Sequence, residues 1–200
     1  MKLYGSALSG NSFKARLLLH LLGVEHELVP LDLGAGEGRA PAFLALNPRG
    51  QIPTLQLDDG RAIWDSQAIL AYLARCHGRE WLPEEPFAMA EVMAWLAVAE
   101  NELLYGLAHA RAIVRFARPW DLARAQEHGR AGLALMEQHL ATREWLAAGR
   151  ATIADVACYP YVALAPEGEV PLGPYPSVRA WIARIQALPG YVDMEGIARV

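Results

Sequence analysis

The chain has 200 residues, of which 54% are apolar and 20% are charged. This composition is typical of a globular protein and excludes disorder as its main state. The formal net charge is −4 and no basic run is present. Nucleic-acid binding depends on clustered cations that neutralise phosphates, so the charge argues against a nucleic-acid partner.

The longest stretches without a charged side chain, 3–13 and 156–166, hold 11 residues each. A membrane-spanning helix needs roughly 18 to 20 apolar residues, so we expect no membrane association. Met1 to Tyr4 lead into small and polar residues rather than into the apolar run of a signal peptide. We therefore expect a cytoplasmic protein.

Metal-binding and disulfide patterns are missing. Cys76 and Cys158 are the two cysteines, too few for a disulfide framework or a four-thiolate zinc site, and both fall in apolar helical patterns. We expect both to be buried small hydrophobes. The six histidines form no HExxH motif, so we expect no metal.

The first 78 residues alternate strand-like and helical segments. Strands are predicted at 2–4, 27–31, 54–57 and 61–64, and helices at 12–22, 41–46 and from 65–66 to Gly78. Gly23 is placed to end the first helix in a left-handed conformation. Asp58-Asp59-Gly60 predicts a hairpin between the last two strands.

The rest of the chain is predicted to be helical. Segment 79–86 carries two prolines and three acidic residues, which favours an interdomain linker. Helical periodicity then covers 87–114, 120–142, 152–164 and 177–187. The sequence therefore predicts a first domain at 1–78 and an all-helical domain at 87–200.

Loop 5–12 joins the first strand to the first helix and carries Ser9 and Asn11. Such a loop can place a hydroxyl and an amide beside the positive end of the helix dipole, where an anion or thiolate is stabilised. Serine, asparagine and glycine are also ordinary cap and turn residues, and capping is the more common explanation of this segment alone.

The segment NPRGQIPTL, residues 47–55, precedes an apolar strand. A cis Ile52–Pro53 bond would turn the backbone of Ile52 out of the sheet, free to pair with an extended peptide. Only about 5 to 6% of X–Pro bonds in folded proteins are cis, so the base rate favours a trans bond.

Two further segments have the pattern of helix caps. Asp65-Ser66 begins a helix. The hydroxyl and the N–H groups there can receive a carboxylate of a ligand and Asp65 can receive an ammonium, although capping alone is the more common explanation. Thr152-Ile-Ala-Asp155 has the form of a capping box with Asp in place of Glu or Gln. From the cap alone, Asp155→Ala costs on the order of 1 kcal/mol of stability.

The order of these segments resembles the cytosolic glutathione S-transferases over essentially all 200 residues. A Ser-x-Asn loop comes first, followed by NPRGQIPTL, DSQAILAYLA, a proline-rich linker and TIADVACYPYV. The loop is most similar to that of bacterial theta- and nu-like members. The resemblance implies a thioredoxin-like βαβαββα domain followed by an all-helical domain, and a glutathione transferase.

Carried over by position, the resemblance implies that Pro53 is cis and that the backbone of Ile52 pairs with the cysteinyl part of glutathione. It places Gln51 near the glycyl carboxylate, and Asp65 and Ser66 at the γ-glutamyl group. It places Ser9 and Asn11 at the glutathione sulfur, and Ser9 is the first candidate for the residue that stabilises the thiolate.

Some positions depart from the family pattern. Gly10 stands where beta-class relatives carry a cysteine, which excludes a mixed disulfide at that position. Tyr4 lies one residue before the tyrosine of other classes and is given no catalytic role. Asp65 replaces the more usual glutamate.

By analogy, a small hydrophobic electrophile would lie between the domains against helix 87–114 and its Tyr105, His109 and Arg111. The family also implies a homodimer formed by helices 87–114 and 120–142. Glutathione-dependent disulfide reduction or peroxide chemistry at the same site is an alternative, and so is a non-catalytic interaction protein.

Overall fold

The computed structural model describes all residues, 1–200, and divides the chain into two compact units. The first unit comprises Met1–Arg79 together with Pro189–Glu195, and the second comprises Glu80–Leu188 with Gly196–Val200. No helix is both long and apolar enough to cross a membrane.

The first unit is built on a four-stranded sheet with the order β2 (Glu27–Pro30), β1 (Lys2–Gly5), β3 (Thr54–Gln56) and β4 (Ala62–Trp64). β1 runs parallel to β2 and antiparallel to β3, and β3 and β4 form the expected hairpin. Gly60 in the hairpin turn has a φ of +88°, which glycine adopts without steric cost.

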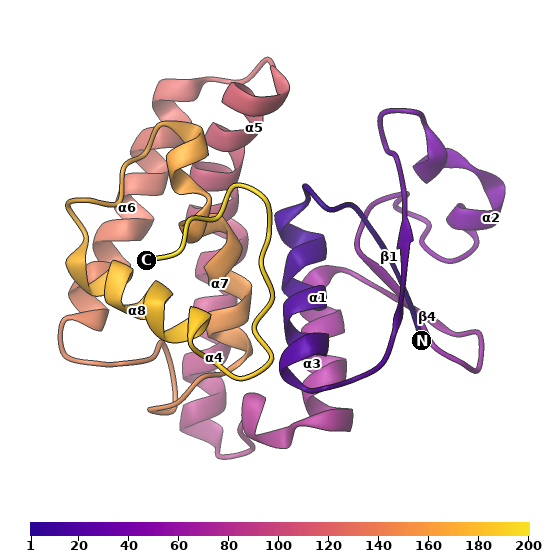
Figure 1. The fold of residues 1–200 in the computed structure, drawn as a ribbon, viewed down its shortest axis with the longest axis horizontal. Coiled ribbons are helices and arrows are strands. Elements are labelled where there is room, and N and C mark those ends of the chain that lie inside the picture. The colour runs from indigo at the N-terminus through magenta and orange to yellow at the C-terminus, as the bar shows by residue number, and fades with distance from the viewer. The chain divides into compact units, whose positions relative to one another are not determined.

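Two longer helices, α1 (Gly10–Leu21) and α3 (Ser66–His77), pack against each other on one face of the sheet, and the short helix α2 (Pro41–Leu44) lies on the other side (Figure 1). The 3₁₀ turn η1 (Glu37–Arg39) precedes α2. The order βαβαββα agrees with the thioredoxin-like arrangement that the resemblance implies. Gly23, with a φ of +64°, follows α1 as predicted.

The end of the chain departs from the predicted domain 87–200, because 189–195 packs with the first unit. Arg16 of α1 donates from Nη2 to the carbonyl oxygen of Asp193 at 2.6 Å. A Cβ on Gly190 would lie 2.7 Å from the carbonyl oxygen of His20, so a glycine allows this close approach. The segment has no helical or strand periodicity that could have indicated this contact.

The second unit is all-helical. Its elements are η2 (Arg79–Trp81, which straddles the unit boundary), α4 (Pro86–Val98), the π-helical segment η3 (Ala99–Ala108), α5 (His109–Phe116), α6 (Leu122–Leu140), α7 (Ile153–Ala163), η4 (Ala165–Gly168) and α8 (Pro176–Gln186). The predicted helix 87–114 is thus three consecutive elements. Segment η3 packs against α6 where Gly106 meets Gly129, and a Cβ on Gly106 would lie 2.3 Å from the Gly129 nitrogen.

The centre of this unit is organised around Asp155, whose side chain is buried. The predicted capping box is present. The Thr152 side chain accepts a backbone N–H of the first turn of α7, and the Asp155 carboxylate accepts the backbone N–H of Thr152. Asp155 also accepts from Trp181 Nε1 at 2.9 Å and from the Leu146 N–H at 3.1 Å. This residue therefore does more than cap α7.

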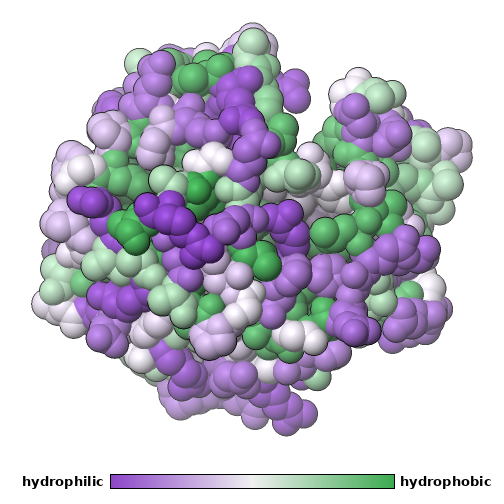
Figure 2. Space-filling model, in the orientation of Figure 1, coloured by the Kyte–Doolittle hydropathy of each residue, from purple (hydrophilic) through white to green (hydrophobic).

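The two cysteines have different environments. Cys158 is buried in α7 and its sulfur contacts the Trp95 carbonyl oxygen at 3.6 Å, as a small buried hydrophobe would. Cys76 is exposed, so the prediction for it is wrong, because it lies outside the buried face of α3. On the face shown in Figure 2, hydrophobic residues lie in small groups among hydrophilic ones.

Candidate functional site

Strand register brings three of the predicted site segments to one end of the sheet. Tyr4 at the end of β1 pairs with Thr54 at the start of β3, and Thr54 pairs with Trp64 at the end of β4. The loop after β1, the loop before β3 and the turn into α3 therefore all leave the sheet at the same place. These are the segments that carry Ser9, Pro53 and Ser66.

Ser9 is the N-cap of α1. Its Oγ accepts the N–H of Ser12 at 3.2 Å, which confirms the capping interpretation. The loop is braced by Ser6, whose carbonyl oxygen accepts the N–H of Ser9 at 3.2 Å and whose N–H donates to Ser12 Oγ at 3.3 Å. Capping uses Ser9 Oγ as an acceptor, so its hydroxyl hydrogen can still be donated to an anion at the positive end of α1.

Asn47 holds the loop before β3. Its buried Nδ2 donates to the carbonyl oxygen of Gln51 at 2.7 Å and to Thr54 Oγ1 at 3.0 Å. The Ile52–Pro53 bond inside this loop is cis, as the resemblance implies and against the base-rate expectation. Pro53 is buried, whereas Ile52 is half-buried and Gln51 is exposed. Sequence reasoning missed Asn47, although an Asn-Pro pair before the loop was a signal for a side chain that organises a turn.

Asp65 and Ser66 begin α3 as predicted. Asp65 adopts a φ of +79° and accepts the N–H of Gln67 at 2.9 Å, which makes it the N-cap. Ser66 is buried, and its Oγ donates to Asn11 Oδ1 at 3.1 Å. This bond joins two predicted site residues that are 55 positions apart in the sequence.

A cation, Arg49, lies beside Asp65. Arg49 Nη1 is 3.8 Å from Asp65 Oδ2, and its guanidinium lies 5.7 Å from the ring centre of Trp64. Both partners of the ion pair are partly exposed, so the pair contributes little to stability. Its position matters more, because a guanidinium here can attract a carboxylate of a ligand. Sequence reasoning did not select Arg49 although it lies inside the NPRGQIPTL segment.

The residues predicted to contact an electrophile do not all lie together. Tyr105 and His109 are in edge-on contact, with ring centres 5.0 Å apart, and His109 stacks on Trp120 at 4.2 Å. Burial lowers the pKa of His109 below its usual value, which favours the neutral ring. These three rings line a groove of about 760 Å³ in the second unit.

Arg111, the third residue predicted to contact the electrophile, lies apart from Tyr105 and His109. It is buried and its Nε donates to Glu167 Oε2, and Arg115 donates to the other oxygen of the same carboxylate. Residues two positions apart on a helix point in different directions, so Arg111 does not share the face of His109. It is held in a structural ion pair and does not line the groove of Tyr105 and His109.

Comparison with known proteins gives consistent matches. The sequence matches the family described as "Glutathione S-transferase, N-terminal domain" over residues 8–76 and "Glutathione S-transferase, C-terminal domain" over residues 118–184. It is 35% identical to a probable glutathione S-transferase GSTF2 of Oryza sativa subsp. japonica, over 94% of this chain and 93% of the rice protein. It is 31% identical to maleylacetoacetate isomerase of Pseudomonas aeruginosa, over 90% of this chain and 88% of that enzyme. A solved structure of a glutathione S-transferase from Pseudomonas fluorescens has a TM-score of 0.92 and 36% identity, over 97% of this chain and 98% of that one.

Proposed function

The chain belongs to the glutathione S-transferase family and acts as a glutathione transferase, and we propose that it binds reduced glutathione where Ser9, Asn11 and Ser66 meet. There it activates the thiol for attack on a small hydrophobic electrophile. The bond from Ser66 to Asn11 carries this proposal. It ties a residue expected at the γ-glutamyl group to one expected at the sulfur.

The chemical task is to stabilise a thiolate. A free thiol has a pKa near 8.5, so only a few per cent is ionised at neutral pH. The Ser9 hydroxyl, the Asn11 amide and the N-terminus of α1, a helix of 12 residues, all favour the anion. Lowering the pKa by one to two units needs about 1.4 kcal/mol for each unit. Because the cytoplasm keeps thiols reduced, we propose that the protein works there.

The rest of the peptide is proposed to lie along the same end of the sheet. The backbone of Ile52 pairs with the cysteinyl part, and the bond that Asn47 donates to Gln51 holds that stretch in place. Asp65 and Ser66 receive the γ-glutamyl group. Arg49, which is paired with Asp65, adds a cation for the γ-glutamyl carboxylate, and Gln51 receives the glycyl carboxylate.

For the electrophile, we propose contacts with Tyr105 and His109. Their stacked aromatic surface, extended by Trp120, suits an apolar or planar molecule. Arg111 is left out because Glu167 already holds it.

We propose a homodimer that covers α4, a helix in which Glu91 is the one charged residue. Val92, Trp95 and Leu96 face the core, yet Phe87 is 72% exposed and Met93 is 44% exposed on the outer side. Large apolar side chains on the outer face of a helix favour a partner that covers them, and nothing within the chain does so. Sedimentation at micromolar concentration should give twice 21.9 kDa. A 21.9 kDa species alone would contradict this dimer.

The transferase proposal is tested by titration calorimetry with reduced glutathione, combined with ultraviolet absorbance of the bound thiolate. The wild type should bind glutathione with a thiol pKa one to two units below that of the free peptide. Ser9→Ala or Asn11→Ala should restore the free value, and Ser177→Ala on α8 serves as a matched control. An unshifted thiol pKa, or no binding at millimolar glutathione, would refute the proposal.

The Pseudomonas aeruginosa relative favours glutathione-dependent isomerisation as a second candidate. Disulfide reduction by the same thiolate is a further alternative, although Gly10 leaves no cysteine at that position for a mixed disulfide with the protein. Turnover of 1-chloro-2,4-dinitrobenzene, of hydroxyethyl disulfide and of a cis-olefinic diacid, each with glutathione, compares the three activities. The proposed function predicts the highest rate with the first substrate.

A further inference from the structure

A cavity of about 260 Å³ lies inside the first unit, between α1 and the strands β1 and β2. Its walls are largely apolar, formed by Leu3, Phe13, Leu28 and Pro30, and it opens to the surface at Leu28, which is 49% exposed. None of the residues assigned to glutathione lines it. An apolar cavity of about 150 Å³ is large enough to hold benzene, so this one has room for an aromatic ring and a polar group.

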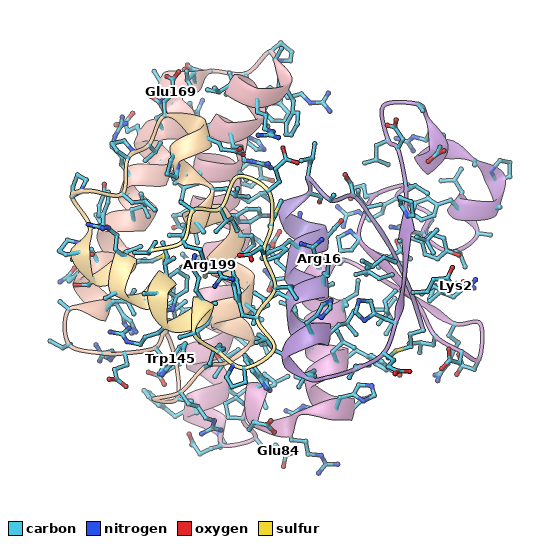
Figure 3. The ribbon with its side chains drawn as sticks, viewed as in Figure 1. Lys2, Arg16, Glu84, Trp145, Glu169 and Arg199 are labelled. Carbon is cyan, nitrogen blue, oxygen red and sulfur yellow. The ribbon has the colours of Figure 1, made fainter.

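Arg16 also lines this cavity and is incompletely paired. Its Nη2 donates to the Asp193 carbonyl oxygen, and its guanidinium lies 5.0 Å from the ring centre of Phe13. Its Nε is buried and has no hydrogen-bond partner. No carboxylate of the chain forms an ion pair with it. Because no carboxylate of the chain neutralises the Arg16 guanidinium on α1 (Figure 3), a ligand carboxylate in the cavity can form a charge-assisted hydrogen bond with it.

A hydroxyl lies at the same cavity. Ser6 lines it, and the Ser6 Oγ accepts the N–H of Leu8 at 3.4 Å, so its hydrogen can be donated to another acceptor. The cavity therefore offers apolar walls, a guanidinium without an ion-pair partner and one hydroxyl donor. This combination suits a carboxylate attached to a small apolar body.

We propose that this cavity binds a small hydrophobic carboxylic acid, with the carboxylate on Arg16 and Ser6 and the apolar body between Phe13 and Leu28. The site is separate from the proposed glutathione site and does not depend on it. It shares a wall with it, however, because Ser6 and Ser12 also brace the loop that carries Ser9. An occupied cavity would therefore stiffen the loop that holds the thiolate donor.

The test uses phenylacetate as the probe and titration calorimetry on the full chain. Phenylacetate should bind saturably at millimolar concentration. Phenylacetamide, which has the same shape without the charge, should bind at least about tenfold more weakly. Binding of phenylacetate should persist in saturating S-hexylglutathione, which separates this cavity from the glutathione site.

Substitutions test whether phenylacetate binds in this cavity. Arg16→Met keeps the apolar stem and removes the charge, and it should weaken phenylacetate at least about tenfold. Arg179→Met, at an exposed arginine of α8, should have no effect. Leu28 lies on the cavity's face of β2, where it pairs with Leu3. Leu28→Trp fills the cavity and should abolish binding even if Arg16→Met folds poorly.

Four results would overturn the proposal. These are no phenylacetate binding to the wild type, equal binding of the acid and the amide, loss of phenylacetate binding in S-hexylglutathione, and unchanged binding in Leu28→Trp. Since glutathione binding is measured separately, failure here leaves the transferase proposal standing, and the reverse also holds.

Discussion

Replacing Asp155 by alanine removes the acceptor of four hydrogen bonds. Three N–H donors lose their partner, at Leu146, Thr152 and Trp181, together with the Thr152 hydroxyl, which can rotate away. Each buried donor without an acceptor costs about 1 to 3 kcal/mol, and partial entry of water favours the lower end of that range. The expected loss is about 3 to 5 kcal/mol, well above the roughly 1 kcal/mol that a cap alone contributes.

Urea unfolding followed by circular dichroism and tryptophan fluorescence measures this loss. Heating should show it as a fall of roughly 6 to 20 °C in the midpoint. Asp121→Ala is the matched control, because Asp121 caps α6 on the surface and accepts only the Arg124 N–H. That variant should lose about 1 kcal/mol or less. An Asp155→Ala loss no larger than the control would refute the assignment of the buried network.

The same carboxyl group predicts a pH dependence. Burial raises the pKa of Asp155 from its ordinary value of 3.8 to about 6. Between these two values the folded chain holds a proton that the unfolded chain has released, so this contribution to stability falls as pH rises. The difference between the wild type and Asp155→Ala should be larger at pH 5 than at pH 7, by about 1.3 kcal/mol. An equal difference at both pH values would contradict the raised pKa.

Three other substitutions test separate features. Gly106→Ala drives a Cβ into the backbone of α6 and should cost about 3 kcal/mol in urea unfolding, whereas Gly173→Ala, with nothing within 4 Å, should change stability by under about 0.5 kcal/mol. Ser66→Ala removes the donor to Asn11 and should weaken glutathione binding about tenfold in calorimetry, and an unchanged affinity would argue against its role. Phe87→Asp places a charge on the exposed face of α4 and should leave monomers in sedimentation, so a persistent dimer would place the interface elsewhere.

Local patterns predicted most of the fold. The hairpin around Gly60 and the capped start of α3 depend on turn and cap residues a few positions apart, so the sequence shows them directly. The resemblance added what spacing could not, namely the cis bond before Pro53. The Ser66 bond to Asn11 joins residues 55 positions apart, and only strand register brings them together.

The environments of three residues could not be predicted, for one physical reason. The place of Arg111 on a helix does not show its partner, which is Glu167, 56 positions away. Cys76 lies in an apolar run, yet its burial depends on which face of α3 the sheet covers. Asn47 resembles an ordinary turn residue until its contacts with Gln51 and Thr54 are known. Sequence periodicity predicts the type of an element, whereas the burial and the bonding partners of its residues depend on the elements packed against it.

The return of 189–195 to the first unit has a consequence for synthesis on the ribosome. Residues 1–79 emerge first, but the segment that covers the end of α1 follows about 110 residues later. At about 5 to 20 residues per second, the nascent first unit spends roughly 5 to 20 seconds without it. During that time the surface of α1 around Arg16 and His20 is open to chaperones, and the unit is completed only when almost the whole chain has been made.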